Sequence, residues 1–177
     1  MSLPDIEPVV RALLAGELAI VPTETVYGVA GLATDPAVLQ KLRDLKGDRG
    51  DKPFPVQVPL GYPLATLVQL SPLAQQTLEA WPGPLTVVLP LVADLPGLQG
   101  TIGLRCPDHP VMQAILERTG PLAVPSANRS GEPPPTTYEA AVAGLAPVSL
   151  PGVDGGPGSG QPSRVVRVTD TIEVLRR

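Results

Sequence analysis

Six short polar segments contain the side chains that could bind or transform a ligand. Hydroxyl and amide groups stand there beside several arginines and lysines. This combination suits an anionic ligand with many oxygen atoms, because guanidinium groups bind phosphate or carboxylate through paired hydrogen bonds. The residue types therefore predict a pocket for phosphate and carboxylate groups. The alternative is that each segment is only a turn or a helix cap, since Ser, Thr, Asn, Gly and Pro dominate turns. The segments are PTETVYG (22–28), LKGDRGDK (45–52), TIGLR (101–105), PSANRSGEPPPTT (125–137), QPSR (161–164) and LRR (175–177).

Other kinds of catalytic or cofactor site lack their characteristic residues. No G-x-x-x-x-G-K-[ST] motif occurs, which excludes a P-loop, and the glycine-rich segment 152–160 does not match G-x-G-x-x-G. Ser126 lacks a G-x-S-x-G turn, and the single histidine, His109, precedes it, which argues against a serine hydrolase. The single cysteine, Cys106, excludes an internal disulfide and a cysteine-based zinc site.

Composition and charge indicate one folded domain. The 177 residues are 43% hydrophobic and 17% charged, which is typical of a globular protein with a substantial core. The net charge of −4 argues against broad, sequence-independent binding of nucleic acid. All three lysines nevertheless fall within residues 41–52, so this stretch is either a solvated helix end or a local positive field. The sequence shows neither a signal pattern nor a membrane span, and we expect a cytoplasmic protein.

Hydrophobic periodicity predicts the elements that position the polar segments. Helices are expected over 6–14, 36–45, 71–81, 108–120 and 137–145, and strands over 18–21, 54–58, 85–92, 101–105, 163–168 and 172–176. The segment TDP (34–36), Ser71 and Asp108 are the expected N-terminal helix caps. Helices and strands alternate without an internal repeat or a linker, which predicts a single α/β domain with a mixed sheet.

The same segments, in the same order, resemble the YrdC/Sua5 family over nearly the whole chain. The counterparts of the family motifs are VPTETVYGVAGLATDP (21–36), LKGDRGDK (45–52), WPGPLT (81–86), RCPDHP (105–110) and SANRSG (126–131). The resemblance implies one YrdC-like domain over residues 1–177, without the separate C-terminal domain of the longer Sua5 members. It also implies a twisted sheet of parallel and antiparallel strands, flanking helices and a concave, positively lined cavity.

The function that the resemblance implies is that of an L-threonylcarbamoyladenylate synthase, a nucleotidyltransferase. Such an enzyme makes threonylcarbamoyl-AMP and pyrophosphate from L-threonine, bicarbonate or CO2 and ATP, with Mg²⁺ expected beside ATP and no metal site on the protein. The product serves the t6A modification of adenosine 37 in tRNA, through downstream transfer proteins. The alternative is a paralogue without synthase activity that binds tRNA or double-stranded RNA or assists ribosome maturation. Carbamoyltransferase relatives carry zinc-finger and acylphosphatase segments, for which this chain has neither the cysteines nor the length.

The resemblance also implies roles for individual residues. Thr25 and Tyr27 are expected to shape the wall of the cavity, and His109 to pack at a helix N-terminus. The expected L-threonine contacts are Thr23, Lys52, Arg105, Ser126 and Ser163. The expected ATP contacts are Lys46, Arg49, Thr101, Asn128, Thr136 and Arg176, of which Lys46 and Arg49 are also expected to be catalytic.

One segment departs from the family pattern. The family usually has Lys-x-Arg, whereas here Asp48 occupies the arginine position and Arg49 follows it. The flanking glycines are expected to let the loop bring Arg49 to the phosphates, because glycine adopts backbone conformations closed to other residues. The alternatives are weaker ATP binding or a paralogue with another task.

Overall fold

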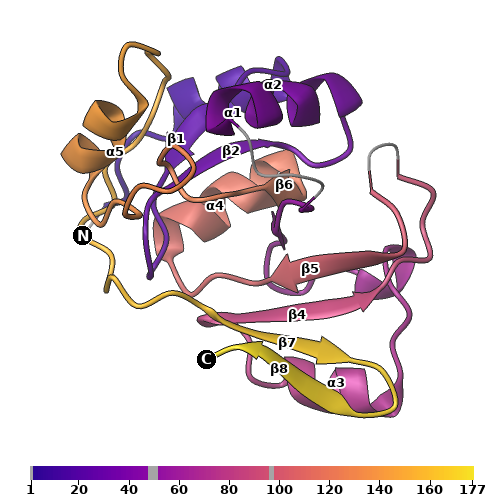
Figure 1. The fold of residues 1–177 in the computed structure, drawn as a ribbon. Coiled ribbons are helices and arrows are strands. Elements are labelled where there is room, and N and C mark those ends of the chain that lie inside the picture. The colour runs from indigo at the N-terminus through magenta and orange to yellow at the C-terminus, as the bar shows by residue number, and fades with distance from the viewer. Residues whose placement is uncertain (1, 48–51, 96–97) are drawn as a thin grey trace.

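The computed structural model describes residues 2–47, 52–95 and 98–177, which form an eight-stranded sheet with flanking helices (Figure 1). Arg49 therefore lies outside the described residues. The helices are α1 (Glu7–Leu14), α2 (Pro36–Lys46), α3 (Pro72–Leu78), α4 (Pro110–Thr119) and α5 (Tyr138–Leu145), with a 3-10 turn η1 (Leu64–Thr66). The strands are β1 (Ala19–Val21), β2 (Gly28–Leu32), β3 (Val56–Gln57), β4 (Leu85–Pro90), β5 (Thr101–Arg105), β6 (Leu122–Ala123), β7 (Arg164–Val168) and β8 (Ile172–Arg176).

The sheet is mixed, as the alternation of elements predicted. The spatial order of its strands is β1-β2-β6-β3-β5-β4-β7-β8. Strand β3 runs parallel to β5, and β4 runs parallel to β7, whereas the other neighbours pair antiparallel. Figure 1 shows β5, β4, β7 and β8 fanned out below the group that contains α1, α2, α4, β1, β2 and β6. The two parts meet at the short central strand β3.

Two buried apolar clusters hold the helices against the sheet. Helix α1 buries Val9, Val10 and Leu13 against Met112 and Ile115 of α4, whereas Leu14 at its last turn is exposed. Helix α2 packs onto β2 at Gly31, where an added Cβ would lie 2.4 Å from a methyl of Val38. Glycine is required there because a side chain would push the helix off the sheet.

The helix caps confirm two predictions and correct a third. The Asp35 carboxylate accepts a hydrogen bond from Ala37 N at 2.9 Å, and Ser71 Oγ caps α3. Helix α4 is capped by His109 and not, as predicted, by Asp108: His109 Nδ1 accepts from Met112 N at 3.5 Å. The cap falls on residue 109 because a residue that precedes a proline is extended, so the helix begins at Pro110.

The sequence analysis missed the strands β2 and β6. Both are short and almost wholly buried, so neither shows the alternating pattern by which a half-buried strand is recognised. The predicted helix 71–81 ends earlier, at Leu78. None of the helices in the described ranges is long and apolar enough to cross a membrane.

Candidate functional site

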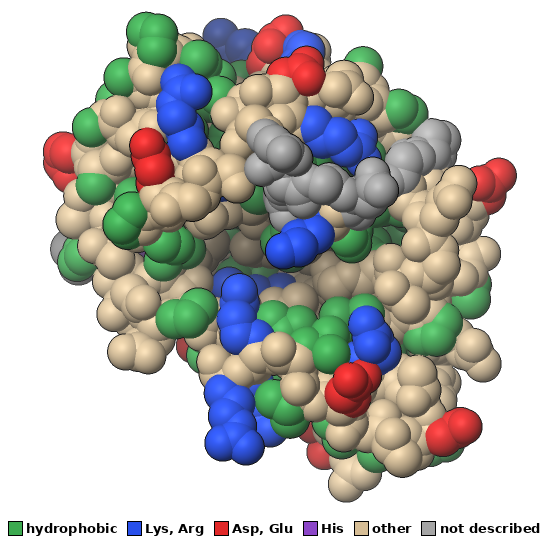
Figure 2. All heavy atoms as spheres, viewed as in Figure 1, with side chains coloured by type: hydrophobic (Ala, Val, Ile, Leu, Met, Phe, Trp, Pro, Cys, Tyr) green, Lys and Arg blue, Asp and Glu red, His purple; other side chains and the backbone are tan. Residues whose placement is uncertain are grey.

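Two adjoining cavities lie over the concave side of the sheet, where Figure 2 shows a hollow bordered by basic side chains. The sheet lobe has a volume of about 410 Å³ and the loop lobe about 390 Å³, sizes typical of small-molecule sites. Both lobes are lined by Pro55, Arg105, Val124, Ser163 and Arg176. The sheet lobe adds, among others, Phe54, Gln57, Thr86, Val88, Thr101 and Arg167, and the loop lobe adds Thr25, Val26, Ser126, Pro134, Gly160 and Pro162.

Arg105 lies where the two lobes join, at the end of β5. Its side chain is buried, and Nη2 lies 2.6 Å from Glu24 Oε1. Nη1 and Nη2 also donate to Thr25 Oγ1 at 3.2 and 3.1 Å. Strand β5 brings the guanidinium to the cavity, and the turn after β1 presses Glu24 and Thr25 against it. An anionic ligand at Arg105 would therefore meet a cation already held in place by two neighbours.

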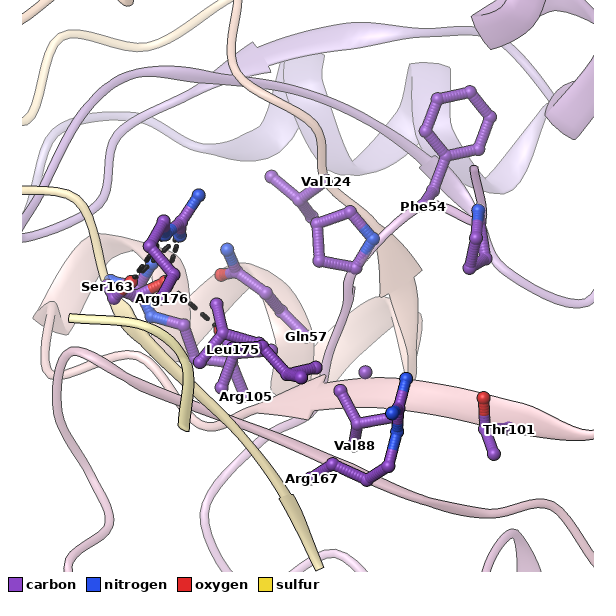
Figure 3. A pocket seen from close by; sticks show the side chains of 15 residues that line it. Phe54, Gln57, Val88, Thr101, Arg105, Val124, Ser163, Arg167, Leu175 and Arg176 are labelled. Atoms are coloured by element: carbon purple, nitrogen blue, oxygen red, sulfur yellow. Dashed lines mark hydrogen bonds between the residues drawn. The ribbon is translucent and has the colours of Figure 1, made fainter. Parts of the chain in front are cut away.

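Arg176, near the end of β8, supplies a second guanidinium at the junction. Its Nε and Nη2 donate to the carbonyl of Ser163 at 3.0 and 2.8 Å, and Nη2 also donates to Ser163 Oγ at 3.0 Å (Figure 3). Ser163 Oγ shares a further hydrogen bond with Thr86 Oγ1 at 3.0 Å. Burial and the charge of Arg105 lower the pKa of Arg176. Two guanidinium groups that repel each other across a cavity favour an anion between them.

The two threonines of the PTETVYG segment have different surroundings. The Thr23 hydroxyl donates to the Val26 carbonyl at 2.6 Å and accepts from Thr25 N and Val26 N, each at 3.2 Å. Its hydrogen bonds thus close the turn that follows Pro22. Thr25 is the threonine that lines the loop lobe, and Thr23 is not among the lining residues. The contact between Thr23 and L-threonine stays a prediction.

Lys46 joins the end of α2 to the SAN segment. Its buried ammonium donates to the carbonyl of Ser126 at 2.6 Å, to the carbonyl of Asn128, and to Asn128 Oδ1 at 3.1 Å. Ser126 lines the loop lobe, and Lys46 and Asn128 stand behind it. This arrangement fixes the loop lobe at the SAN segment, in which Ser126 is predicted to contact L-threonine and Asn128 to contact ATP.

The structure brings five of the predicted site residues to the joined lobes and leaves the other described ones outside their lining, whereas Arg49 lies outside the described residues. The five are Thr101, Arg105, Ser126, Ser163 and Arg176. Thr136 lies in the adjoining wall, where its carbonyl accepts from Gly158 N at 2.8 Å, and Lys52 is exposed. Thr101 begins β5 and Arg105 ends it, so they mark opposite ends of the sheet lobe.

Sequence reasoning missed three polar residues that line the sheet lobe: Gln57, Thr86 and Arg167. Each stands in a strand whose sequence is apolar or alternating. Gln57 and Arg167 belong to no motif, and Thr86 ends the WPGPLT motif, for which no residue role was predicted. For Gln57 a signal existed, because a glutamine within the apolar run FPVQV has to be buried or to face a ligand.

Tyr27 fastens the glycine-rich loop 152–160 to the wall of the loop lobe. Its hydroxyl donates to Asp154 Oδ1 at 2.9 Å and to the Gly156 carbonyl at 2.8 Å, and it accepts from Gly155 N at 3.1 Å. The loop lies so close that a Cβ on Gly158 would be 2.3 Å from the Thr25 carbonyl oxygen. Burial raises the pKa of Tyr27 to about 12. The expected role of Tyr27 in shaping the wall is consistent with these contacts.

Replacing Tyr27 with phenylalanine is expected to lower the melting temperature at pH 8 by about 2–8 °C, because hydrogen bonds worth about 1–2 kcal/mol are lost. The pKa rises from 10.0 in the unfolded chain to about 12 in the fold, so this stabilisation is complete below pH 10 and is lost as pH rises toward 12. Thermal unfolding at pH 8 and pH 11 should therefore show a smaller difference at the higher pH. The control is Tyr62→Phe, and equal melting temperatures for Y27F and wild type at pH 8 would contradict the assignment.

The fold and the site define an α/β protein whose cavity suits anionic small molecules, since arginines and hydroxyls line both lobes and no described lining residue is acidic. The chain belongs to the Sua5/YciO/YrdC family, whose model, described as "Telomere recombination", matches residues 11–177. The resemblance noted in the sequence is thus confirmed.

The chain aligns over nearly its whole length with named relatives. It is 37% identical to the threonylcarbamoyl-AMP synthase of Bacillus subtilis over 98% of its own length, and 39% identical to a putative threonylcarbamoyl-AMP synthase of Mycobacterium tuberculosis over 94%. The structure of P. abyssi Sua5 complexed with L-threonine superposes with a TM-score of 0.89 and 30% identity over 97% of this chain. The chain spans 53% of the Bacillus protein, 81% of the Mycobacterium protein and 53% of the Pyrococcus chain.

Proposed function

We propose that this chain is an L-threonylcarbamoyladenylate synthase, a nucleotidyltransferase that joins L-threonine, bicarbonate or CO2, and ATP. The observation that carries the proposal is that Arg105 and Arg176 both line the two lobes, at the place where these join. A reaction between two anionic substrates needs cations at the point where the two lobes meet. The names of the relatives and the L-threonine bound in P. abyssi Sua5 support this choice of substrates.

The two lobes offer separate places for L-threonine and ATP. L-Threonine would occupy the sheet lobe with its carboxylate on Arg105, and ATP would occupy the loop lobe beside Ser126. Lys46 and Asn128, both expected to hold ATP, support this placement because they stand behind Ser126. Ser126, expected to contact L-threonine, lines only the loop lobe, and Thr101, expected to hold ATP, lies at the far end of the sheet lobe, so these two do not support it. Arg49 would complete the phosphate contacts from outside the described residues.

The adenylation step requires positioning and charge stabilisation rather than an acid or a base. The neutral amine of threonine first adds to CO2 and releases one proton to solvent, which gives an N-carboxylate, and one oxygen of that group attacks the α-phosphorus of ATP as the bond to pyrophosphate breaks. The attacking oxygen is already an anion, so no side chain has to remove its proton. Arg105 and Arg176 would stabilise the negative charge that gathers between the substrates. No described lining residue of either lobe is His, Asp or Glu, in keeping with this chemistry.

Mg²⁺ would enter as part of the nucleotide substrate. The described residues contain no group of three or more His, Cys, Asp or Glu side chains that could hold a metal ion. The triphosphate can supply oxygen ligands itself, since Mg²⁺ is commonly bound through substrate phosphates. The labile product would pass to downstream proteins that transfer it to tRNA, and a cytoplasmic location is part of this proposal.

The test is release of pyrophosphate from the purified chain. Release is expected only when ATP, L-threonine and bicarbonate are present together, and threonylcarbamoyl-AMP should form in equal amount. No release above background with all three substrates would refute the synthase. A fluorescence titration with tRNA at several salt concentrations tests the alternative: tight, salt-sensitive binding without pyrophosphate release would favour the RNA-binding paralogue.

A further inference from the structure

The buried side-chain polar atoms that lack a hydrogen-bond partner gather at one place among the described residues. They are both carboxylate oxygens of Glu24, Nε of Arg105 and Oε1 of Gln57. Glu24 and Arg105 still compensate each other as charges, because their ionic contact measures 2.6 Å. Gln57 is uncharged, so no ionic contact compensates its unpaired oxygen. Buried groups without partners are rare in folded proteins, and each requires an explanation.

Gln57 belongs to the lining of the sheet lobe. It lies on β3, is only 3% exposed, and pairs in register with Arg105 on the parallel neighbour β5. Figure 3 shows its side-chain amide on the cavity side of the strand, near Arg105 and Arg176. Val56 and Val58 on either side are buried apolar residues of the core. A purely structural residue at this position would be expected to be apolar as well, since an unpaired amide oxygen costs free energy.

We propose that Gln57 is a specificity-determining contact: its amide oxygen accepts a hydrogen bond from the α-nitrogen of the amino acid whose carboxylate binds Arg105. This inference rests on the proposed function. The α-nitrogen and the carboxylate share one carbon atom, so the nitrogen is the donor that lies nearest once Arg105 holds the carboxylate. A carboxylated nitrogen keeps one N–H, which allows the same contact before and after the substrate takes up CO2.

The experiment compares wild type with Gln57→Met, which keeps the length of the side chain and removes the acceptor. Binding of L-threonine and of L-2-aminobutyrate, which lacks only the side-chain hydroxyl, is measured by calorimetry. Q57M should weaken both affinities by the same factor, about 10- to 100-fold, because a hydrogen bond to a charged group is lost. Gln76→Met is the matched control: Gln76 is exposed on α3, which lines neither lobe, and both affinities should stay at the wild-type value.

The outcomes separate the proposal from a structural role and from a failure of the proposed function. An unpaired amide contributes no stabilising hydrogen bond, so Q57M should melt at the wild-type temperature or above. Unchanged affinities in Q57M overturn the proposal, as does a loss for L-threonine without a loss for L-2-aminobutyrate, which would assign Gln57 to the hydroxyl. Gln57→Leu provides the same readout, and failure of both variants to fold shows a structural role and overturns the proposal. If wild type binds no L-threonine, the proposed function fails and this inference fails with it.

Discussion

Replacing Arg105 with methionine is expected to lower kcat/KM for pyrophosphate release by about 100- to 1000-fold, the usual effect of removing one charge-stabilising donor from an active site. Arg105 lies at the junction of the two lobes and donates through both terminal nitrogens to Thr25. No other described guanidinium stands at that junction except Arg176, whose hydrogen bonds go to Ser163. The measurement is steady-state kinetics with L-threonine as the varied substrate.

Arg105 also neutralises a carboxylate, and a second variant separates this effect from catalysis. R105M leaves Glu24 buried without its counter-charge, which is expected to destabilise the fold by about 3–5 kcal/mol. The double variant R105M/E24Q removes that charge and should recover most of the stability while the activity stays low. Arg118→Met, which breaks an exposed pair with Glu7, should change neither property appreciably. Recovery of activity in the double variant would contradict a role for Arg105 in substrate binding.

Replacing Lys46 with methionine is expected to destabilise the protein by about 3 kcal/mol or more, which corresponds to a fall of about 6–12 °C in melting temperature. The substitution leaves the carbonyls of Ser126 and Asn128 and the Asn128 amide oxygen without this donor in a buried position. The Michaelis constant for ATP should also rise, because the SAN segment would no longer be held beside the loop lobe. Thermal unfolding and ATP kinetics together check this prediction.

Lys41→Met is the matched control on the same helix. Lys41 is exposed and pairs with Glu17 at 3.0 Å on the surface, so its loss should change the melting temperature by no more than about 2 °C. If K46M melts within about 2 °C of wild type, as K41M is expected to do, the buried ammonium does not hold the SAN segment.

The sequence was sufficient for much of the fold and for the kind of site. Apolar periodicity located the long elements, and Asp35 and Ser71 were recognisable as caps because capping depends on residues within one turn. Residue types also indicated an anion site without acid–base groups, and the motif order indicated the family. These properties depend on local interactions or on residue identity, so no three-dimensional information was needed to infer them.

Tertiary structure decided which side chains meet. The contacts of Arg105 with Thr25 and of Lys46 with Asn128 join residues 80 and 82 positions apart, and they depend on strand register and on how α2 packs. Thr23 and Thr25 differ in their surroundings because the turn after Pro22 uses the first hydroxyl internally and presents the second to the cavity. Gln57 could be identified as a candidate contact only from the structure, because β3 places its unpaired amide oxygen beside Arg105. The residue types thus determined what this site can bind, and the packing of distant segments determined which of those residues line it, because a hydrogen bond depends on positions in space that no local pattern specifies.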